Sequence, residues 1–178
     1  GGFNPRADGI ALDGLERGWA HIERATSNGA DREARFNLMS ASMQGAMAFQ
    51  KGLGCVHSLS HSLGGVNPRL HHGTLNAMFL PAVIAFNASA ESVKKDRRLE
   101  RMAHAMGLHA SDDAAGDIGA AIKAMNARLG LPSGLAAMGV TRDLYDRIIT
   151  GALADHCHKT NPRLASRDDY VAMLDASL

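Results

Sequence analysis

Three histidines in this chain are spaced like the ligands of a metal site. His57 and His61 are four residues apart, so a helix would stack them one turn apart on the same face. A third, His72, follows a break marked by glycine, asparagine and proline at residues 64–68. Imidazole suits Zn²⁺ or Fe²⁺, and a catalytic site for such ions takes three or four protein ligands and keeps one position open. The sequence therefore predicts two helices and a loop that converge on one divalent ion.

The rest of the chain is expected to form helices that position these histidines. Segments rich in Ala, Leu and Met have an apolar period near 3.6 residues, with almost no strand pattern. Helix starts are expected at Asn4 with Pro5, Asp31, Ser89, Ser111, Thr141 and Ser166. Eight helices are predicted, at residues 4–29, 31–50 (through Phe36, Met39, Met43 and Met47), around His57 and His61, 73–86, 89–107, 111–130, 141–153 and from 166 onward. We predict an all-α multi-helix bundle in a single domain, residues 1–178.

Composition argues against several functions. The chain carries 19 basic and 18 acidic residues, and its one basic cluster, residues 94–98, is interrupted by Asp96 as on a solvated helix face, so no nucleic-acid partner is expected. No stretch reaches the ~18 uninterrupted apolar residues of a membrane span, and residues 77–86 are expected to form a buried helix. Two cysteines, Cys55 and Cys157, are too few for a disulfide framework, so we expect a reducing, cytoplasmic setting.

A longer pattern around the histidines resembles a known family. It runs from Gly52-Leu-Gly54 through the His-x3-His pair, a Leu-Gly turn and His72-Gly73 to NAMFLP at residues 76–81 and a final Phe-Asn. Segments 4–14, 131–140 and 160–163 match in the same order. The pattern is similar to that of the iron-containing (group III) alcohol dehydrogenases over essentially the whole chain. The resemblance implies the helical C-terminal domain of that fold, which is shared with dehydroquinate synthase-like enzymes.

The resemblance also implies a role for each histidine. His57 and His72 would be ligands of Fe²⁺ or Zn²⁺. His61 would lie beside the metal, facing the substrate and the nicotinamide of NAD or NADP, in a proton-relay or orienting role. His71 adjoins His72, but neighbouring side chains on a helix point about 100° apart, so only one can face the ion. The family places its ligand directly before a glycine, which selects His72.

Other parts of the family's active site are absent from these residues. In the family, an N-terminal α/β domain binds the nicotinamide cofactor, and an Asp-x3-His pair just upstream supplies two more ligands. The chain also begins at Gly1 without an initiator Met. We therefore interpret it as the C-terminal half of a dehydrogenase of small alcohols or aldehydes. It would be inactive alone, would need the nucleotide-binding domain of the same protein, and would form a homo-oligomer.

Two alternatives stay open at this point. A maleylacetate reductase-like enzyme would share the pattern, although the spacing at residues 57–61 and 72–77 is closer to the alcohol dehydrogenases. A non-catalytic helical interaction or regulatory domain could keep the histidines without the chemistry. A nucleotide-binding domain in the reading frame directly upstream would favour the enzyme.

Three further features have simple structural interpretations. Lys51 is expected to be exposed at a helix end, and residues 156–158 to form a polar turn. Gly64 and Gly65 are expected to supply positive φ at the end of the histidine-bearing helix.

Overall fold

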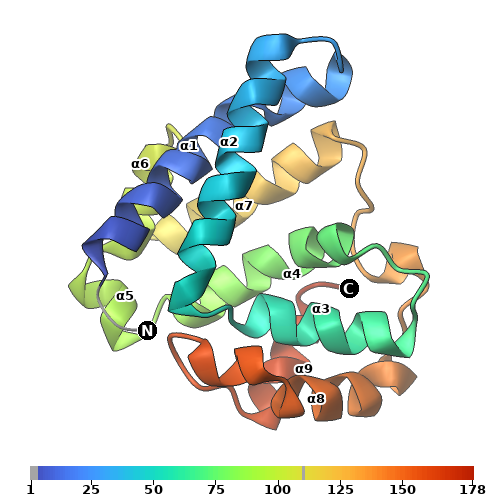
Figure 1. The fold of residues 1–178 in the computed structure, drawn as a ribbon. Coiled ribbons are helices and arrows are strands. Elements are labelled where there is room, and N and C mark those ends of the chain that lie inside the picture. The colour runs from blue at the N-terminus through green and yellow to red at the C-terminus, as the bar shows by residue number, and fades with distance from the viewer. Residues whose placement is uncertain (1–3, 110) are drawn as a thin grey trace.

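The computed structural model describes residues 4–109 and 111–178, and within these ranges the chain forms α-helices and short 3₁₀ turns without β-strands. The all-α prediction is confirmed. The helices are α1 (Pro5–Ser27), α2 (Arg32–Ala48), α3 (Cys55–Val66), α4 (His72–Asn87), α5 (Glu91–Lys95), α6 (Arg98–Ala105), α7 (Ala114–Arg128), α8 (Tyr145–Ala154) and α9 (Arg167–Asp175). In Figure 1, α1 and α2 form a hairpin at one end, α3 and α4 cross the middle, and α8 and α9 lie at the other end.

Three expected helix starts are confirmed. The Asn4 side chain accepts a hydrogen bond from the first turn of α1, which has Pro5 at its start. Asp31 caps α2 in the same way. Ser166 and Asp169 form a reciprocal capping box at the start of α9. Each cap depends only on residues within one turn, so local sequence is enough to predict it.

The helix expected at residues 89–107 is instead two helices, α5 and α6. The chain turns at Arg97, which has a φ of 48°, and this left-handed conformation interrupts a right-handed helix. The Arg98 guanidinium donates hydrogen bonds to the Ser92 carbonyl at 3.1 Å and to Asp96 at 2.8 Å. This side chain folds back over α5 and stabilises the break.

Three expected caps differ in the structure. Ala90 rather than Ser89 precedes α5, and Thr141 precedes a 3₁₀ turn before α8 begins. Asp113 rather than Ser111 caps α7, and the Ser111 hydroxyl accepts a hydrogen bond from the Asp113 N–H at 3.2 Å. The carboxylate is favoured over the hydroxyl because the N-terminus of a helix attracts negative charge.

The end of α3 also differs from the expectation. Gly64 and Gly65 lie inside the helix, which continues to Val66, and neither is among the described glycines with positive φ. Pro68 disfavours helical geometry at Asn67. The proline therefore ends the helix, and the glycines do not.

Two apolar clusters share α4. The first joins α4 to α3, α8 and α9, with Leu59, Phe79 and Ile148 fully buried. The second joins Ile84 of α4 to α6, α7 and Trp19 of α1. Burial on two sides accounts for the nearly continuous apolar sequence of α4. Among the described residues, no helix is both long and apolar enough to cross a membrane.

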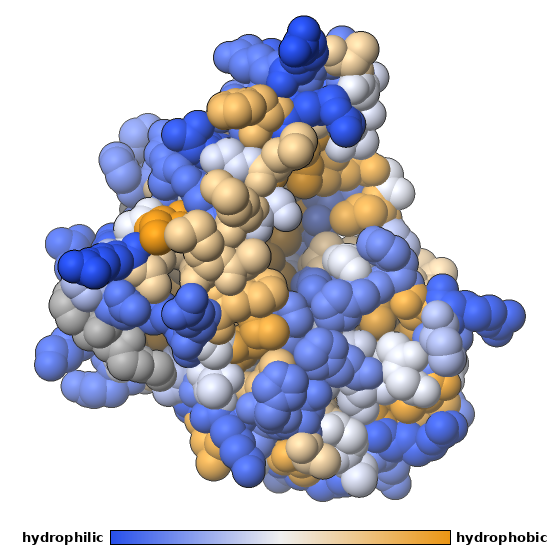
Figure 2. Space-filling model, viewed as in Figure 1, coloured by the Kyte–Doolittle hydropathy of each residue, from blue (hydrophilic) through white to orange (hydrophobic). Residues whose placement is uncertain are grey.

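The large apolar side chains of α2 lie on the surface rather than in the core. The helix packs on α1 through small residues, since Ala34 is fully buried and a Cβ at Gly18 would touch Ala41. Its outer face is 50–71% exposed, and Figure 2 shows apolar residues gathered over this helix. We call this face the α2 stripe; it consists of Phe36, Met39, Met43 and Met47.

Candidate metal centre

The start of α3 is held by a residue from near the end of the chain. The Asn161 side chain accepts a hydrogen bond from the Cys55 N–H at 3.1 Å. It donates to the Asn87 side chain and to the Arg163 carbonyl, both at 2.7 Å. A Cβ at Gly54 would collide with the same amide. One buried amide therefore ties the start of α3 to the end of α4 and requires glycine in the loop.

The three histidines identified from the sequence lie together. His57 and His61 are on α3, and α4 begins with His72. The distances between ring centroids are 5.6 Å for His57 and His61, 5.4 Å for His57 and His72, and 5.3 Å for His61 and His72. The imidazoles thus form a triangle where the two helices meet, which we call the histidine triangle.

Hydrogen bonds orient His72. The Ser60 hydroxyl donates to the His57 carbonyl at 3.2 Å and lies 3.3 Å from His72 Nδ1, so it is left to accept from Nδ1–H. This tautomer, assigned from the network, leaves the Nε2 lone pair for a metal. The Asn76 amide nitrogen lies 3.1 Å from Nε2, and its Oδ1 is buried without a partner among the described residues. An unpaired acceptor beside the imidazoles fits a bound cation.

His71 makes different contacts from its neighbour. It is the N-cap of α4, and its Nδ1 accepts a hydrogen bond from the Thr74 N–H at 3.3 Å. The same nitrogen lies 3.2 Å from the Thr74 hydroxyl. The geometry therefore favours His72 over His71 as a candidate ligand.

His57 lies half-buried in the histidine triangle. Burial, followed by the proximity of His72 and His61, lowers the pKa of His57. Its ring is therefore neutral near pH 7, which is the form that binds metal. The Phe49 ring packs edge-on against it, with 6.1 Å between centroids. The donor set of His57 and His72 fits a divalent ion.

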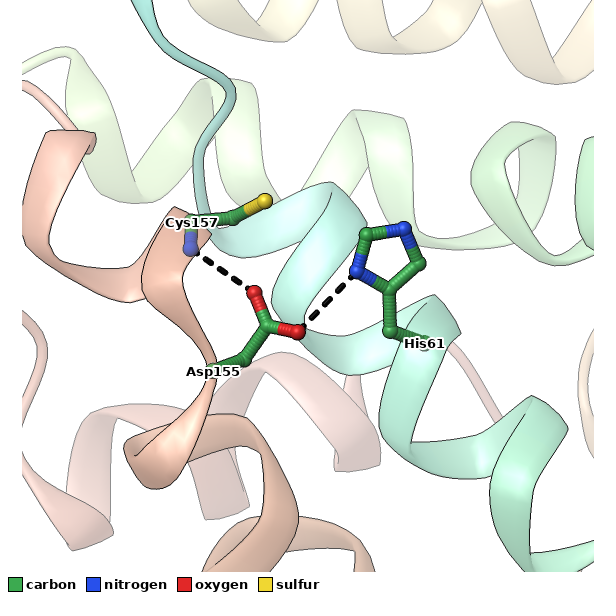
Figure 3. Close-up of side chains that lie close together, drawn as sticks. All are labelled: His61, Asp155 and Cys157. Atoms are coloured by element: carbon green, nitrogen blue, oxygen red, sulfur yellow. Dashed lines mark hydrogen bonds and ion pairs between the residues drawn. The ribbon is translucent and has the colours of Figure 1, made fainter.

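His61 forms a hydrogen bond with Asp155, a residue 94 positions away in the sequence. Its Nδ1 lies 3.0 Å from Asp155 Oδ2, and Asp155 Oδ1 accepts from the Cys157 N–H at 2.7 Å, as Figure 3 shows. Burial alone would raise the pKa of Asp155. Hydrogen bonds from Cys157 and His61 nevertheless hold this pKa below its ordinary value. Potential ligand atoms of His61, Asp155 and Cys157 also lie within 4.8 Å of one another. Asp155 could not be identified from the sequence, because no local spacing connects it to His61.

Two interpretations from the sequence are corrected. Residues 156–160 form a 3₁₀ turn, η4 (His156–Thr160), but Cys157 and His158 are buried rather than on a polar surface. Lys51 is not an exposed helix-end residue, because its ammonium group pairs with the nearly buried Asp8 carboxylate. In both cases a tertiary contact covers side chains that the local sequence suggests are solvated.

A largely apolar cavity opens beside the histidine triangle. Its volume is about 530 Å³, and it is lined by His57, Asn76 and Lys51 together with apolar residues such as Leu80 and Leu99. A pocket of this size and composition suits a small organic ligand. One candidate ligand, His57, therefore borders a space that a substrate could enter.

Cys55 and Cys157 are expected to be unreactive thiols. Both are fully buried, and burial raises the pKa of each to about 11, so little thiolate exists at about pH 8. We expect iodoacetamide to leave both unmodified in the native chain and to alkylate both in urea, as measured by mass spectrometry. Rapid alkylation of either thiol in the folded chain would contradict its burial.

Comparisons with known proteins agree with this geometry. The family model described as "Fe-containing alcohol dehydrogenase family, C-terminal" matches residues 3–178. The chain is 63% identical over 180 residues to 4-hydroxybutyrate dehydrogenase of Cupriavidus necator, covering 99% of the chain and 46% of that protein. The crystal structure of a 1,3-propanediol oxidoreductase is similar to this chain, with a TM-score of 0.90 and 29% sequence identity. The crystal structure of maleylacetate reductase from Agrobacterium tumefaciens is also similar, with a TM-score of 0.78 and 27% sequence identity. Each match covers 98% of this chain and 46% of the other chain. The chain thus spans about half the length of these relatives.

Proposed function

The chain belongs to the iron-containing alcohol dehydrogenase family, and from this membership we propose that it forms the metal-binding half of the active site of a metal- and nicotinamide-dependent alcohol dehydrogenase. The reaction would be reversible hydride transfer between an alcohol and NAD or NADP. The histidine triangle beside an apolar cavity is the observation that supports this function most. Because the chain spans 46% of its relatives, we propose that a nucleotide-binding domain of the same protein completes the site and that the chain alone is inactive.

Within this site, we assign the ligand roles to His57 and His72. His57 is neutral near pH 7 because its pKa is lowered. The bond to Ser60 keeps the His72 proton on Nδ1, so that a metal would replace the Asn76 amide at Nε2. A bound Fe²⁺ or Zn²⁺ would supply Lewis-acid stabilisation of negative charge on the alcohol oxygen. His61 would face the substrate and the nicotinamide and move the hydroxyl proton. The apolar cavity would keep water away from the hydride.

A small ω-hydroxy acid such as 4-hydroxybutyrate is the substrate class we propose. It is supported by the 63% identity with a 4-hydroxybutyrate dehydrogenase. A maleylacetate reductase-like activity is the second candidate and has less support, since the TM-score of 0.78 is below the 0.90 of the propanediol oxidoreductase. A non-catalytic helical module is the third, and the unpaired Asn76 Oδ1 beside His72 and a neutral His57 favours the enzyme over it.

We further propose that the protein works in the cytoplasm as a homo-oligomer. Cys55 and Cys157 are free, buried thiols, as expected in a reducing compartment. The α2 stripe is an apolar surface that another domain or subunit would cover.

A chimera tests the function. This chain would replace the matching C-terminal region of the Cupriavidus necator enzyme, and reduction of NAD⁺ would be followed by absorbance with 4-hydroxybutyrate, 1,3-propanediol and methanol as substrates. We expect NAD⁺ reduction that is lost on chelation and restored by Fe²⁺ or Zn²⁺, with the isolated chain as the inactive control. A folded chimera that binds NAD⁺ and metal yet oxidises none of these alcohols would contradict the proposal.

A further inference from the structure

The Asp155 carboxylate is held at both of its oxygens. Oδ2 accepts from His61 Nδ1 at 3.0 Å, and Oδ1 accepts from the Cys157 N–H at 2.7 Å, which caps η4. The Asp155 side chain is only 16% exposed. It cannot rotate without breaking one of these bonds, so it offers His61 a fixed acceptor.

The packing of α3 on α8 brings the two residues into register. Ser62, next to His61, donates its hydroxyl to the Ile148 carbonyl of α8 at 2.7 Å. Ile148 is fully buried in the cluster that joins α8 to α3. Asp155 is the C-cap of α8, so this helix places the carboxylate against His61 across 94 residues of sequence.

A hydrogen bond explains this contact better than a metal ion shared by His61, Asp155 and Cys157. The 3.0 Å separation of Nδ1 and Oδ2 is that of an N–H···O bond. Cys157 takes part in this contact through its backbone N–H, which donates to Asp155 Oδ1 at 2.7 Å. An ionised carboxylate can only accept, so the shared proton lies on Nδ1. Nε2 lies on the edge of the ring away from Asp155 (Figure 3).

We propose that Asp155 is a positioning residue, which holds His61 in its Nδ1–H tautomer and leaves Nε2 as the acceptor for the proton of the substrate hydroxyl. This inference rests on the proposed function, because that function gives His61 a proton to move. During oxidation the proton passes from the alcohol oxygen to Nε2, and in the reverse reaction it returns. The opposite tautomer would place a hydrogen on Nε2, where an acceptor is needed.

The tautomer of His61 can be measured in the chain itself. Long-range ¹H–¹⁵N spectra of the histidine-labelled chain, under alkaline conditions where imidazoles are neutral, distinguish protonated from bare ring nitrogens; a His61→Gln variant assigns the signals. We expect a proton on Nδ1 and none on Nε2. Asp155→Asn keeps the shape but turns an amide N–H toward Nδ1, so we expect His61 to switch to Nε2–H. The matched control, Asp168→Asn in the exposed first turn of α9, should change nothing.

Three outcomes in the isolated chain would overturn the positioning role: Nε2–H in the wild-type chain, no switch in Asp155→Asn, or a Co²⁺–thiolate absorption band that disappears in Cys157→Ser. In the chimera, Asp155→Asn should lower kcat by about 10²-fold with little change in KM, and Asp155→Glu should restore part of the loss. An unchanged kcat would also overturn it. If the wild-type chimera is inactive while the tautomers are as expected, the proposed function fails and the orientation of His61 by Asp155 stands.

Discussion

Replacing His72 by alanine is expected to remove the divalent metal and all measurable turnover from the chimeric enzyme, whereas His71→Ala should leave both nearly unchanged. The bond to Ser60 leaves Nε2 of His72 as an acceptor, which contacts the Asn76 amide at 3.1 Å and would bind the metal in its place, and the ring lies 5.4 Å from that of His57. His71 is occupied in capping α4, so its loss should cost only about 1 kcal/mol of stability. Metal analysis after dialysis, beside steady-state turnover, checks both variants.

Two comparisons complete this test. His61→Ala should keep the metal and slow turnover by about 10²-fold, because it removes a proton acceptor and no ligand. The isolated chain should bind Zn²⁺ far more weakly than the chimera, since each added ligand closes the coordination shell. If His71→Ala loses the metal and His72→Ala keeps it, the ligand assignment is wrong by one residue.

Asn161→Ala is expected to destabilise the chain by about 3 kcal/mol. The substitution removes the hydrogen bonds to Cys55, Asn87 and Arg163 and leaves the Cys55 N–H buried without an acceptor. Because stabilities of whole domains are about 5–15 kcal/mol, this is a large fraction of the total. The free energy of unfolding in urea, followed by circular dichroism, measures it.

Asn28→Ala is the matched control. This exposed asparagine accepts one local hydrogen bond, from the Ala30 N–H at 3.1 Å, so its loss should cost less than about 1 kcal/mol. Equal destabilisation by the two substitutions would show that the Asn161 amide does not hold the start of α3.

Local sequence is enough to predict most of this fold. The caps at Asn4, Asp31 and Ser166 depend on bonds within one turn, and the apolar period marks the helices. The break at Arg97 escapes such reasoning, because it depends on how the Arg98 side chain folds back. Periodicity also identifies an apolar helix face without saying whether another element covers it, so the exposure of the α2 stripe could not be foreseen.

The candidate site divides in the same way. Helical spacing reveals His57 and His61, and the following glycine marks His72. Asp155 and Asn161 lie 94 and 106 residues from the groups they bond, so only the packing of α3 against the end of the chain brings them to the site. A single sequence carries no spacing signal over such separations.

The α2 stripe determines where oxidative damage to this chain begins. Met39, Met43 and Met47 are 50–71% exposed, whereas Met78 and Met173 are buried in the core. Peroxide converts an accessible thioether into a polar sulfoxide, which disrupts apolar contacts and can be reversed by reductases. Damage would therefore begin on α2 and reach the core last. Oxidation would therefore turn this exposed apolar face hydrophilic before it altered the buried methionines, and it would weaken any apolar contact made through the α2 stripe.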